Sequence, residues 1–317
     1  MKKCFYVLAA LACCACSKGV TDSSVKMDEV VELKFSVPVA ATKASGSVTE
    51  NAVESLQIFV FGTDGQIQAS GQASENSLTL TCTAGEKTIA AVVNASDLEG
   101  VATLSGLNQR LSDFSDNSLG RFVMSGAVTQ TLLASGEVVI PVKRLVSKVT
   151  LSSVVRDFKL DQHKTMDFEL MSVFVTSVPQ QVGFFSTAQS SELINEGVTD
   201  LPAIIEGSGE LLYDTLGDVS VAQGAVAEVG NFLYPYPNGL IDASRPAYLV
   251  LQTRLGDGIY YYSVELPKME SNMRYDVSLT VTMPGSLTPN VPVKKEDAIF
   301  SVSVMDWAGK VDVNETI

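Results

Sequence analysis

The sequence predicts an all-β protein with two β-sandwich domains in tandem. Apolar and polar residues alternate along most of the chain after residue 30, and turn residues such as Asp64-Gly65 separate the alternating runs. Helix signals are few and short, and no motif repeats at a fixed period. A length of 317 residues suffices for two compact domains or one large all-β domain. A polar, irregular stretch that follows Pro179 favours the division into two domains.

The composition is that of a globular chain and argues against a nucleic-acid partner. Apolar residues make up 46% of the chain and charged residues 18%. The 22 basic residues stand against 36 acidic ones, which gives a formal net charge of −14. Because a phosphate backbone is bound by clustered Lys and Arg, we expect no nucleic acid to bind.

Residues 1–15 are expected to be a signal peptide. Lys2 and Lys3 form a basic start, and the apolar core Phe5–Ala12 that follows is too short to cross a membrane as a helix. This segment is therefore left out of the fold.

The cysteines indicate a lipid anchor. Four of the five lie at the N-terminus, namely Cys4, Cys13, Cys14 and Cys16. Cys82 alone lies beyond them, so the mature chain cannot form an internal disulfide. Cys16 stands between a small residue and the polar "SKG", and we expect it to carry lipid, with Cys13 as the alternative. An ordinary cleaved signal with incidental cysteines is the competing interpretation.

The first strand of the mature protein is expected at residues 31–39. The apolar side chains that share one face are Val31, Leu33, Phe35, Val37 and Val39. The strand is followed by Lys43, a lone basic residue in a run of Ala, Thr, Ser and Gly. The sequence thus places an exposed protease-sensitive site directly after a good strand.

The remaining strands are assigned to two domains that meet near Pro179. The first sandwich is expected to span residues 44–179 and the second residues 180–317, which includes terminal strands. A hairpin is expected around Gly256–Gly258 and a strictly alternating strand at 275–283. A short helix is expected within residues 94–111, and Gly207–Gly209 is expected to be a turn.

Catalytic motifs are not found, so we expect no enzyme activity, no metal and no cofactor. His163 is the only histidine, and Cys82 lies in an alternating strand, which does not favour a zinc site. Nucleotide-binding and nucleophile-elbow motifs are missing. Trp307 is expected to be a buried anchor rather than a platform for sugar stacking. The run Tyr260–Tyr262 would place rings on both faces of its strand and leaves a carbohydrate-binding surface open.

Several stretches, in this order, resemble the fimbrillins, the major fimbrial subunits of type V pili of Gram-negative anaerobes. They are the lipoprotein signal, "FSVPVAATKASG", "ESLQIFVFGTDG", "IAAVVNAS", "RFVMSGAVT", "VKRLVSKVTLSSV", "NMRYDVSLTVTMPGS" and "VSVMDW". The resemblance covers nearly the whole mature chain, and it rests on the order and spacing of the pieces more than on any one of them. It implies that both sandwiches are transthyretin-like.

The resemblance also implies a route of assembly. Fimbrillins are exported as lipoproteins to the outer membrane, where a trypsin-like protease, typically arginine-specific, cuts after the first strand. Removal of this plug strand opens a groove, and a terminal strand of the next copy, from its C-terminal region, fills it by β-strand addition. The expected partners are other copies of the chain, accessory fimbrial subunits and the protease. The expected location is the outer membrane and then the fimbria.

Carried over to this sequence, the resemblance makes residues 16–43 a propeptide with the plug strand at 31–39. The cut would fall between Lys43 and Ala44. The family has Arg at this place, and a strictly arginine-specific protease would cut after Lys43 poorly. The donor strand would lie within residues 299–313, where the alternating residues are Phe300, Val302, Val304, Val311 and Val313.

The sequence leaves three functional hypotheses. The first is a pilus subunit that polymerises into adhesive filaments. If Lys43 is not cut, the subunit is instead a terminal anchor, cap or tip. The second is a monomeric surface lipoprotein that binds glycan or host protein, and the third is a hydrolase with an unrecognised site.

Overall fold

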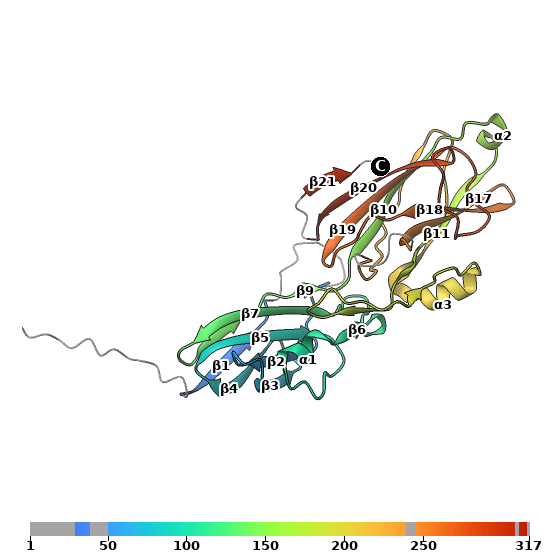
Figure 1. Cartoon of the computed structure of the whole chain (residues 1–317). Coiled ribbons are helices and arrows are strands. Elements are labelled where there is room, and N and C mark those ends of the chain that lie inside the picture. The colour runs from blue at the N-terminus through green and yellow to red at the C-terminus, as the bar shows by residue number, and fades with distance from the viewer. Residues whose placement is uncertain (1–28, 39–49, 239–244, 308–310, 316–317) are drawn as a thin grey trace, which may run out of the picture.

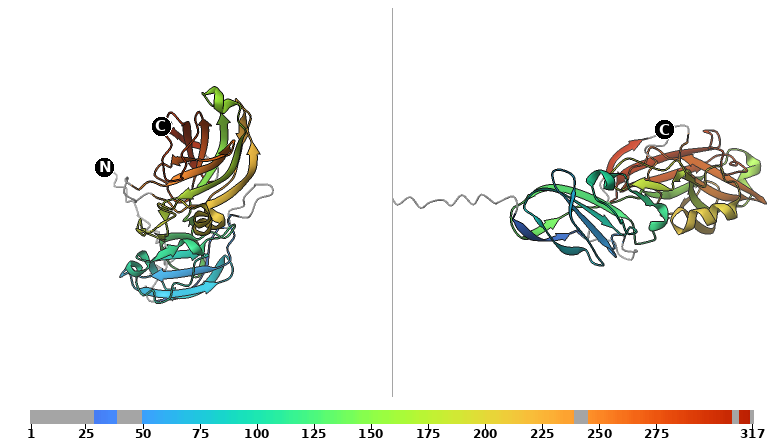
Figure 2. Two further views of the ribbon diagram at one scale, coloured as in Figure 1. Left: turned by 90° about the vertical axis from the view of Figure 1, so that its right-hand side faces the viewer. Right: turned by 60° about the horizontal axis from the view of Figure 1, so that its bottom comes forward.

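The all-β fold is confirmed by the computed structural model, which describes residues 29–38, 50–238, 245–307 and, for the backbone alone, 311–315. Two β-rich lobes follow one another along the long dimension of the molecule (Figure 1). Two further views show the same two lobes, with strands of the first half in one and of the second half in the other (Figure 2). Within the described ranges, no helix is both long and apolar enough to cross a membrane.

The first sandwich has two sheets. The smaller sheet has the order β4 (Ser77–Thr83), β1 (Val30–Ser36) and β8 (Gly136–Val139). The larger sheet has the order β3 (Ile67–Ala73), β2 (Leu56–Phe61), β5 (Gly85–Val93), β7 (Met124–Leu132) and β9 (Lys143–Arg144). β2 is buried along its whole length because one of its faces packs inside this sandwich and the other belongs to a second cluster, formed by residues 90–146 together with residues of the second half of the chain. The unbroken apolar run of this segment reflects that two-sided burial.

Short helical turns follow β5. Thr103 is the N-cap of α1 (Leu104–Asn108), and its hydroxyl accepts a hydrogen bond from the Gly106 amide at 3.0 Å. The helix expected within residues 94–111 is therefore confirmed. β6 (Leu111–Asp113) and the 3₁₀ turn η1 (Phe114–Asp116) come next.

The second sandwich also has two sheets. One has the order β16 (Val226–Glu228), β10 (Lys148–Arg156), β19 (Met273–Val281), β20 (Ala298–Asp306) and β21 (Val311–Glu315). The other has the order β15 (Tyr213–Ser220), β11 (Phe168–Thr176), β17 (Tyr248–Leu255) and β18 (Gly258–Glu265). The short helix α2 (Asp161–Lys164) lies between β10 and β11 in the chain. The expected hairpin joins β17 to β18, and the expected alternation in β19 is confirmed by its burial pattern.

The domain boundary expected near Pro179 is wrong. β10 pairs with β19, and β11 pairs with β15 and β17, so both strands belong to the second sandwich. The boundary therefore lies between β9 and β10. The polar stretch after Pro179 misled the prediction because it connects β11 to β15, two strands of the second sandwich, and does not link the two domains.

The segment between β11 and β15, residues 177–212, lies at the junction between the two lobes. β12 (Val178–Pro179) pairs with β14 (Leu193–Ile194), and β13 (Gln181–Gly183) pairs with β6 of the first half. α3 (Leu201–Leu212) then packs on β11 and β15 (Figure 1). The turn expected at Gly207–Gly209 is wrong in part, because these residues lie inside α3. Gly209, with φ of 55°, introduces a kink there.

Candidate functional site: the groove that holds the first strand

β1 is the middle strand of its sheet and holds the other two together. It pairs antiparallel with β4 from Val30 to Ser36 and parallel with β8 from Leu33 to Ser36. In the described chain, β4 and β8 have no ladder partner except β1. Because adjacent strands lie about 4.8 Å apart, removal of β1 would leave a gap of about 10 Å between β4 and β8.

The inward face of β1 forms part of the first core. Val31, Leu33, Phe35 and Val37 are no more than 3% exposed. They contact residues of β2, β4, β5 and β8 in one cluster. Each such side chain gains about 1.5–3 kcal/mol on burial, so the four together contribute roughly 6–12 kcal/mol against the entropy of ordering the strand. The fifth expected plug residue, Val39, lies outside the described residues.

The outward face of β1 adds polar contacts to β8. The Lys34 ammonium lies 3.4 Å from the Glu137 carboxylate, and the Ser36 hydroxyl donates to the same carboxylate at 3.0 Å. The pKa of Glu137 is lowered, first by the Ser36 hydroxyl and then by Lys34. Both members of the ion pair are about half exposed, so water screens it. Burial of the apolar face therefore dominates the retention of β1.

The expected processing and lipidation residues lie outside the described residues. These residues are Lys43, Ala44, Cys16 and Cys13. The chain is described to residue 38 and again from Glu50.

Glu50 is the first described residue after that interval, and it binds three segments of the junction. Its carboxylate accepts hydrogen bonds from Lys148 Nζ at 2.7 Å, Trp307 Nε1 at 2.8 Å and the Tyr234 hydroxyl at 2.9 Å. Burial raises the pKa of Glu50, but these donors outweigh it and leave the pKa below its usual value. Burial and the neighbouring Glu50 charge raise the pKa of Tyr234. The carboxylate is therefore held ionised between Lys148 and two neutral donors.

The sequence analysis did not single out Glu50 or Lys148. Trp307, expected to be a buried anchor, is half-buried and packs with Phe122 and Tyr234. A signal was available: Arg144 and Lys148 are basic residues four apart in the run "VKRLVSKV", on either side of the apolar pair Leu145–Val146. Both are at most 8% exposed. Buried basic groups require an acidic or carbonyl partner, which the sequence could not locate.

The residues expected to form the donor strand fall into two strands with different roles in this structure. Phe300, Val302 and Val304 lie in β20, which pairs with β19 along its whole length. Val302 is 4% exposed and belongs to the second core. Val311 and Val313 lie in β21, the edge strand of the same sheet. The plug and donor segments lie on different lobes and do not meet within one chain (Figure 1).

The tyrosine run does not form an exposed aromatic surface. Tyr262 is fully buried in the second core. Tyr261 is 8% exposed and packs with Phe174 and with Ile204 of α3 on the other face of its sheet. The rings do alternate between faces, as expected, but α3 covers the second face. The observation that favoured glycan binding at these rings is therefore removed.

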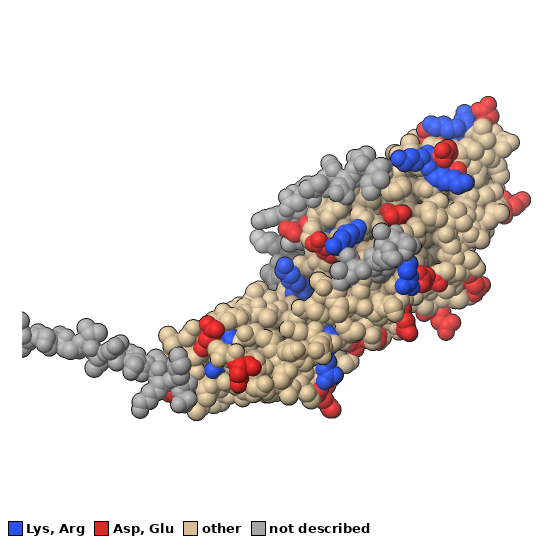
Figure 3. Space-filling model, in the orientation of Figure 1, with Lys and Arg blue, Asp and Glu red and all other residues tan. Residues whose placement is uncertain are grey.

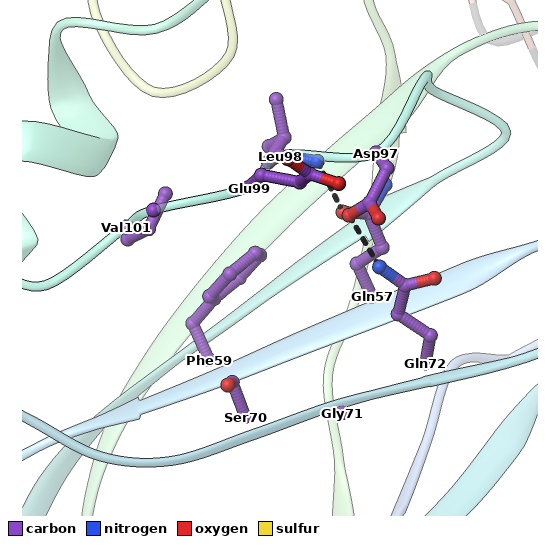
Figure 4. Close-up of a pocket in the computed structure, with 10 residues that line it drawn as sticks. Gln57, Phe59, Ser70, Gly71, Gln72, Asp97, Leu98, Glu99 and Val101 are labelled. Carbon is purple, nitrogen blue, oxygen red and sulfur yellow. Dashed lines mark hydrogen bonds between the residues drawn. The ribbon is translucent and has the colours of Figure 1, made fainter.

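One small polar pocket lies on the outer face of β2 and β3 (Figure 4). Its polar groups hold a loop of the protein itself. The Gln57 side chain donates to the Ser96 carbonyl at 3.0 Å and accepts from the Leu98 amide at 2.9 Å. Gln72 donates to Asp97, which lies beside Gln57 in the pocket (Figure 4). These bonds give the pocket residues a structural role.

Charge is mixed on the face of the molecule that Figure 3 shows, and the described residues include no acidic or histidine cluster suited to a metal. Basic and acidic side chains are interspersed on the face shown in Figure 3. In the part of the chain that the structure describes, no group of three or more His, Cys, Asp or Glu residues could hold a metal ion. His163 lies in α2, where its ring contacts Phe158.

A protein-family model matches the residues that form the first sandwich. Residues 30–165 match the family model described as major fimbrial subunit protein (FimA). This range begins at β1, contains every strand of the first sandwich and ends after β10. The predicted resemblance to the fimbrillins is thereby confirmed, and the matched family is one of structural subunits rather than enzymes. No curated protein matches the chain significantly.

Solved structures share the fold over most of the chain. A fimbrilin (FimA) from Porphyromonas gingivalis has a TM-score of 0.64 at 15% identity, over 92% of this chain and 100% of that one. A candidate cell adhesion protein from Bacteroides eggerthii has a TM-score of 0.65 at 17% identity, over 89% and 98%. The tip fimbrial protein Mfa3 from Porphyromonas gingivalis has a TM-score of 0.51 at 14% identity, over 88% and 100%. At these identities the likeness shows the fold.

Proposed function

We propose, from a family match that spans the whole first sandwich, that this chain is a structural subunit of a cell-surface fimbria assembled by exchange of β1. The chain is exported as a lipoprotein anchored through Cys16, or alternatively Cys13. A trypsin-like protease cuts between Lys43 and Ala44 and releases the segment that contains β1. A C-terminal strand of another copy then takes the place of β1.

The observation that carries this proposal is the position of β1 between β4 and β8. A strand with one covered face and two ladder partners, followed closely by a basic site, is suited to replacement by another strand of the same pattern. Main-chain hydrogen bonds to β4 and β8 would supply affinity, and four inward pockets would supply register. An empty groove would expose unpaired strand edges, so a removable plug protects the monomer from aggregation.

The test is limited proteolysis of the purified chain followed by electrophoresis without denaturation. Low-dose trypsin is expected to produce a ladder of oligomers and a new N-terminus at Ala44. Lys43→Ala is expected to abolish the ladder and leave the thermal unfolding of the monomer unchanged. Oligomers that persist in Lys43→Ala would refute release at this site.

The same experiment addresses a terminal role for the subunit. The cognate protease is compared with trypsin on the same preparation. A chain that the cognate protease leaves intact retains β1 and therefore acts as an anchor, cap or tip. A chain that stays monomeric after the cut, with the groove free, would instead exclude polymerisation by β1 exchange.

A further inference from the structure

Lys87 is a buried cation at one end of the first core. It lies in β5 on the same strand face as Ile89, Ala91 and Val93, which belong to that core. The residue is only 5% exposed. Its ammonium donates one hydrogen bond, to the Ala84 carbonyl at 3.2 Å. Since lysine is almost never buried to this degree unless it is paired, Lys87 requires an explanation.

The described chain offers Lys87 no carboxylate. Ion pairs among the described residues involve other lysines and arginines, and none includes Lys87. An ammonium has three N–H donors, and within the described ranges only one of those of Lys87 has a protein acceptor. A buried charge that is not paired with an opposite charge is costly. The uncleaved chain therefore holds this cation only partly satisfied.

Lys87 borders the groove at the end where β1 begins. The amide of Ala84, whose carbonyl Lys87 binds, donates to the Glu29 carbonyl at 2.7 Å. Cys82, which lies opposite Val31 of β1, also senses the cation: burial raises the pKa of the Cys82 thiol, and the Lys87 charge offsets part of that rise. Release of β1 would therefore uncover the groove beside Lys87.

β1 does not supply the missing acid. Residue 29 is the next position on the inward face of β1, because side chains alternate along a strand. Glu29 stands there, but it is exposed and belongs to none of the ion pairs in the described part of the chain. A strand that places a carboxylate beside Lys87 would gain a charge-assisted hydrogen bond that β1 does not make.

We propose that Lys87 is a specificity-determining residue of the groove, which binds a carboxylate on the apolar face of the strand that replaces β1. The partner is a second copy of this chain, and the carboxylate is that of Glu315. In the sequence, Glu315 follows Val311 and Val313 at a spacing of two and so shares their strand face. The inference rests on the proposed function. It adds a charge requirement that favours the incoming strand over β1.

Lys87→Met in the full chain separates recognition from stability. The variant keeps an unbranched side chain and removes the charge. Because a buried cation without an acid is costly, the uncleaved variant is expected to melt at or above the wild-type temperature. After cleavage with trypsin, the protein concentration needed for half-maximal oligomer formation is expected to rise at least tenfold, since a hydrogen bond between charged groups is lost. A lower melting temperature with unchanged assembly would make Lys87 a structural residue and overturn the proposal.

Glu315→Gln tests the same pair from the incoming strand. It is expected to weaken assembly as much as Lys87→Met does, and the double variant is expected to assemble no more weakly than either single one. Asp312→Asn is the matched control, because residue 312 is an acid on the opposite face of the same segment. Its assembly is expected to stay within twofold of wild type. Losses that multiply in the double variant, or an equal loss in the control, would overturn the pairing of Lys87 with Glu315.

Failure of this pair can be told apart from failure of the proposed function. A cleaved wild-type chain that forms no oligomers refutes the proposed function, and the role of Lys87 falls with it. Wild-type oligomers together with normal assembly of either single variant refute the Lys87–Glu315 pair alone. If Lys87→Met does not fold, Glu315→Gln decides the question, because residue 315 lies in β21 and outside the first sandwich.

Discussion

Cys82 of β4 lies directly opposite Val31 of β1 in their antiparallel ladder, and both side chains are buried in the first core. The thiol is 6% exposed, and burial raises its pKa. Since the thiolate is the reactive form, both effects slow alkylation of Cys82. Removal of β1 would take Val31 away from Cys82 and is therefore expected to make this thiol more reactive.

This relationship predicts that Cys82 reports the release of β1. In the intact chain, labelling of Cys82 by iodoacetamide is expected to be slow. After cleavage at low protein concentration, where donor strands are scarce, labelling is expected to accelerate at least tenfold, and to slow again in oligomers. Peptide mass mapping resolves Cys82 from the N-terminal cysteines. Equal labelling rates before and after release would contradict the loss of Val31 from the core.

Phe35→Ala is expected to destabilise the intact chain and leave the processed oligomer unaffected. Phe35 is fully buried, and large-to-small changes of this kind cost about 3–5 kcal/mol. Urea unfolding of the uncleaved chain measures the loss, and Lys34→Ala on the exposed face is the control, expected to cost less than about 1 kcal/mol. Because cleavage removes β1, oligomers of the variant and wild type should dissociate at the same temperature. A less stable variant oligomer would mean that β1 is retained.

Stability of the domain junction is expected to fall with acid through Glu50. Its pKa is lowered in the folded chain from an ordinary value of 4.5, so its contribution is complete above that pH and is lost as pH drops through the lowered pKa. Glu50→Gln is expected to cost about 1.5–3 kcal/mol at neutral pH, the range for hydrogen bonds to charged groups. The difference from wild type should shrink as the pH is lowered below 4.5. Urea unfolding at a series of pH values measures it, with exposed Glu99→Gln as the control. A difference that stays constant with pH would show that the carboxylate charge is not involved.

Lys43→Arg is expected to increase processing by an arginine-specific protease. Arg presents a planar fork of donors to the carboxylate of a specificity pocket, which Lys cannot reproduce. The rate of appearance of the Ala44 N-terminus is expected to rise at least tenfold with that protease and to change less than threefold with trypsin. If the arginine-specific protease cuts both variants at the same rate, Lys43 is not what limits processing.

The positions of most strands could be predicted from the sequence, but the sandwich to which each strand belongs could not. Alternation located β1, β19 and the β17–β18 hairpin correctly, since burial of one strand face is visible within a few residues. Alternation does not say which strand is the partner, so the polar stretch after Pro179 was taken as the domain boundary, and β10 and β11 were assigned to the wrong sandwich. α3 was missed because its glycines resemble a turn, although Asp200 caps its N-terminus and the helix packs on β11 and β15.

The candidate site shows the same division. By itself, the sequence determined that β1 has one apolar face and is followed by a lone Lys43, and that strands of the same pattern end the chain. Only the tertiary structure decided that β1 lies between β4 and β8, that β20 is a core strand and β21 an edge strand, and that Trp307 meets Glu50. The reason is physical: the side-chain period of a strand is a local property, whereas ladder partners and buried ion contacts join segments that are distant in the chain.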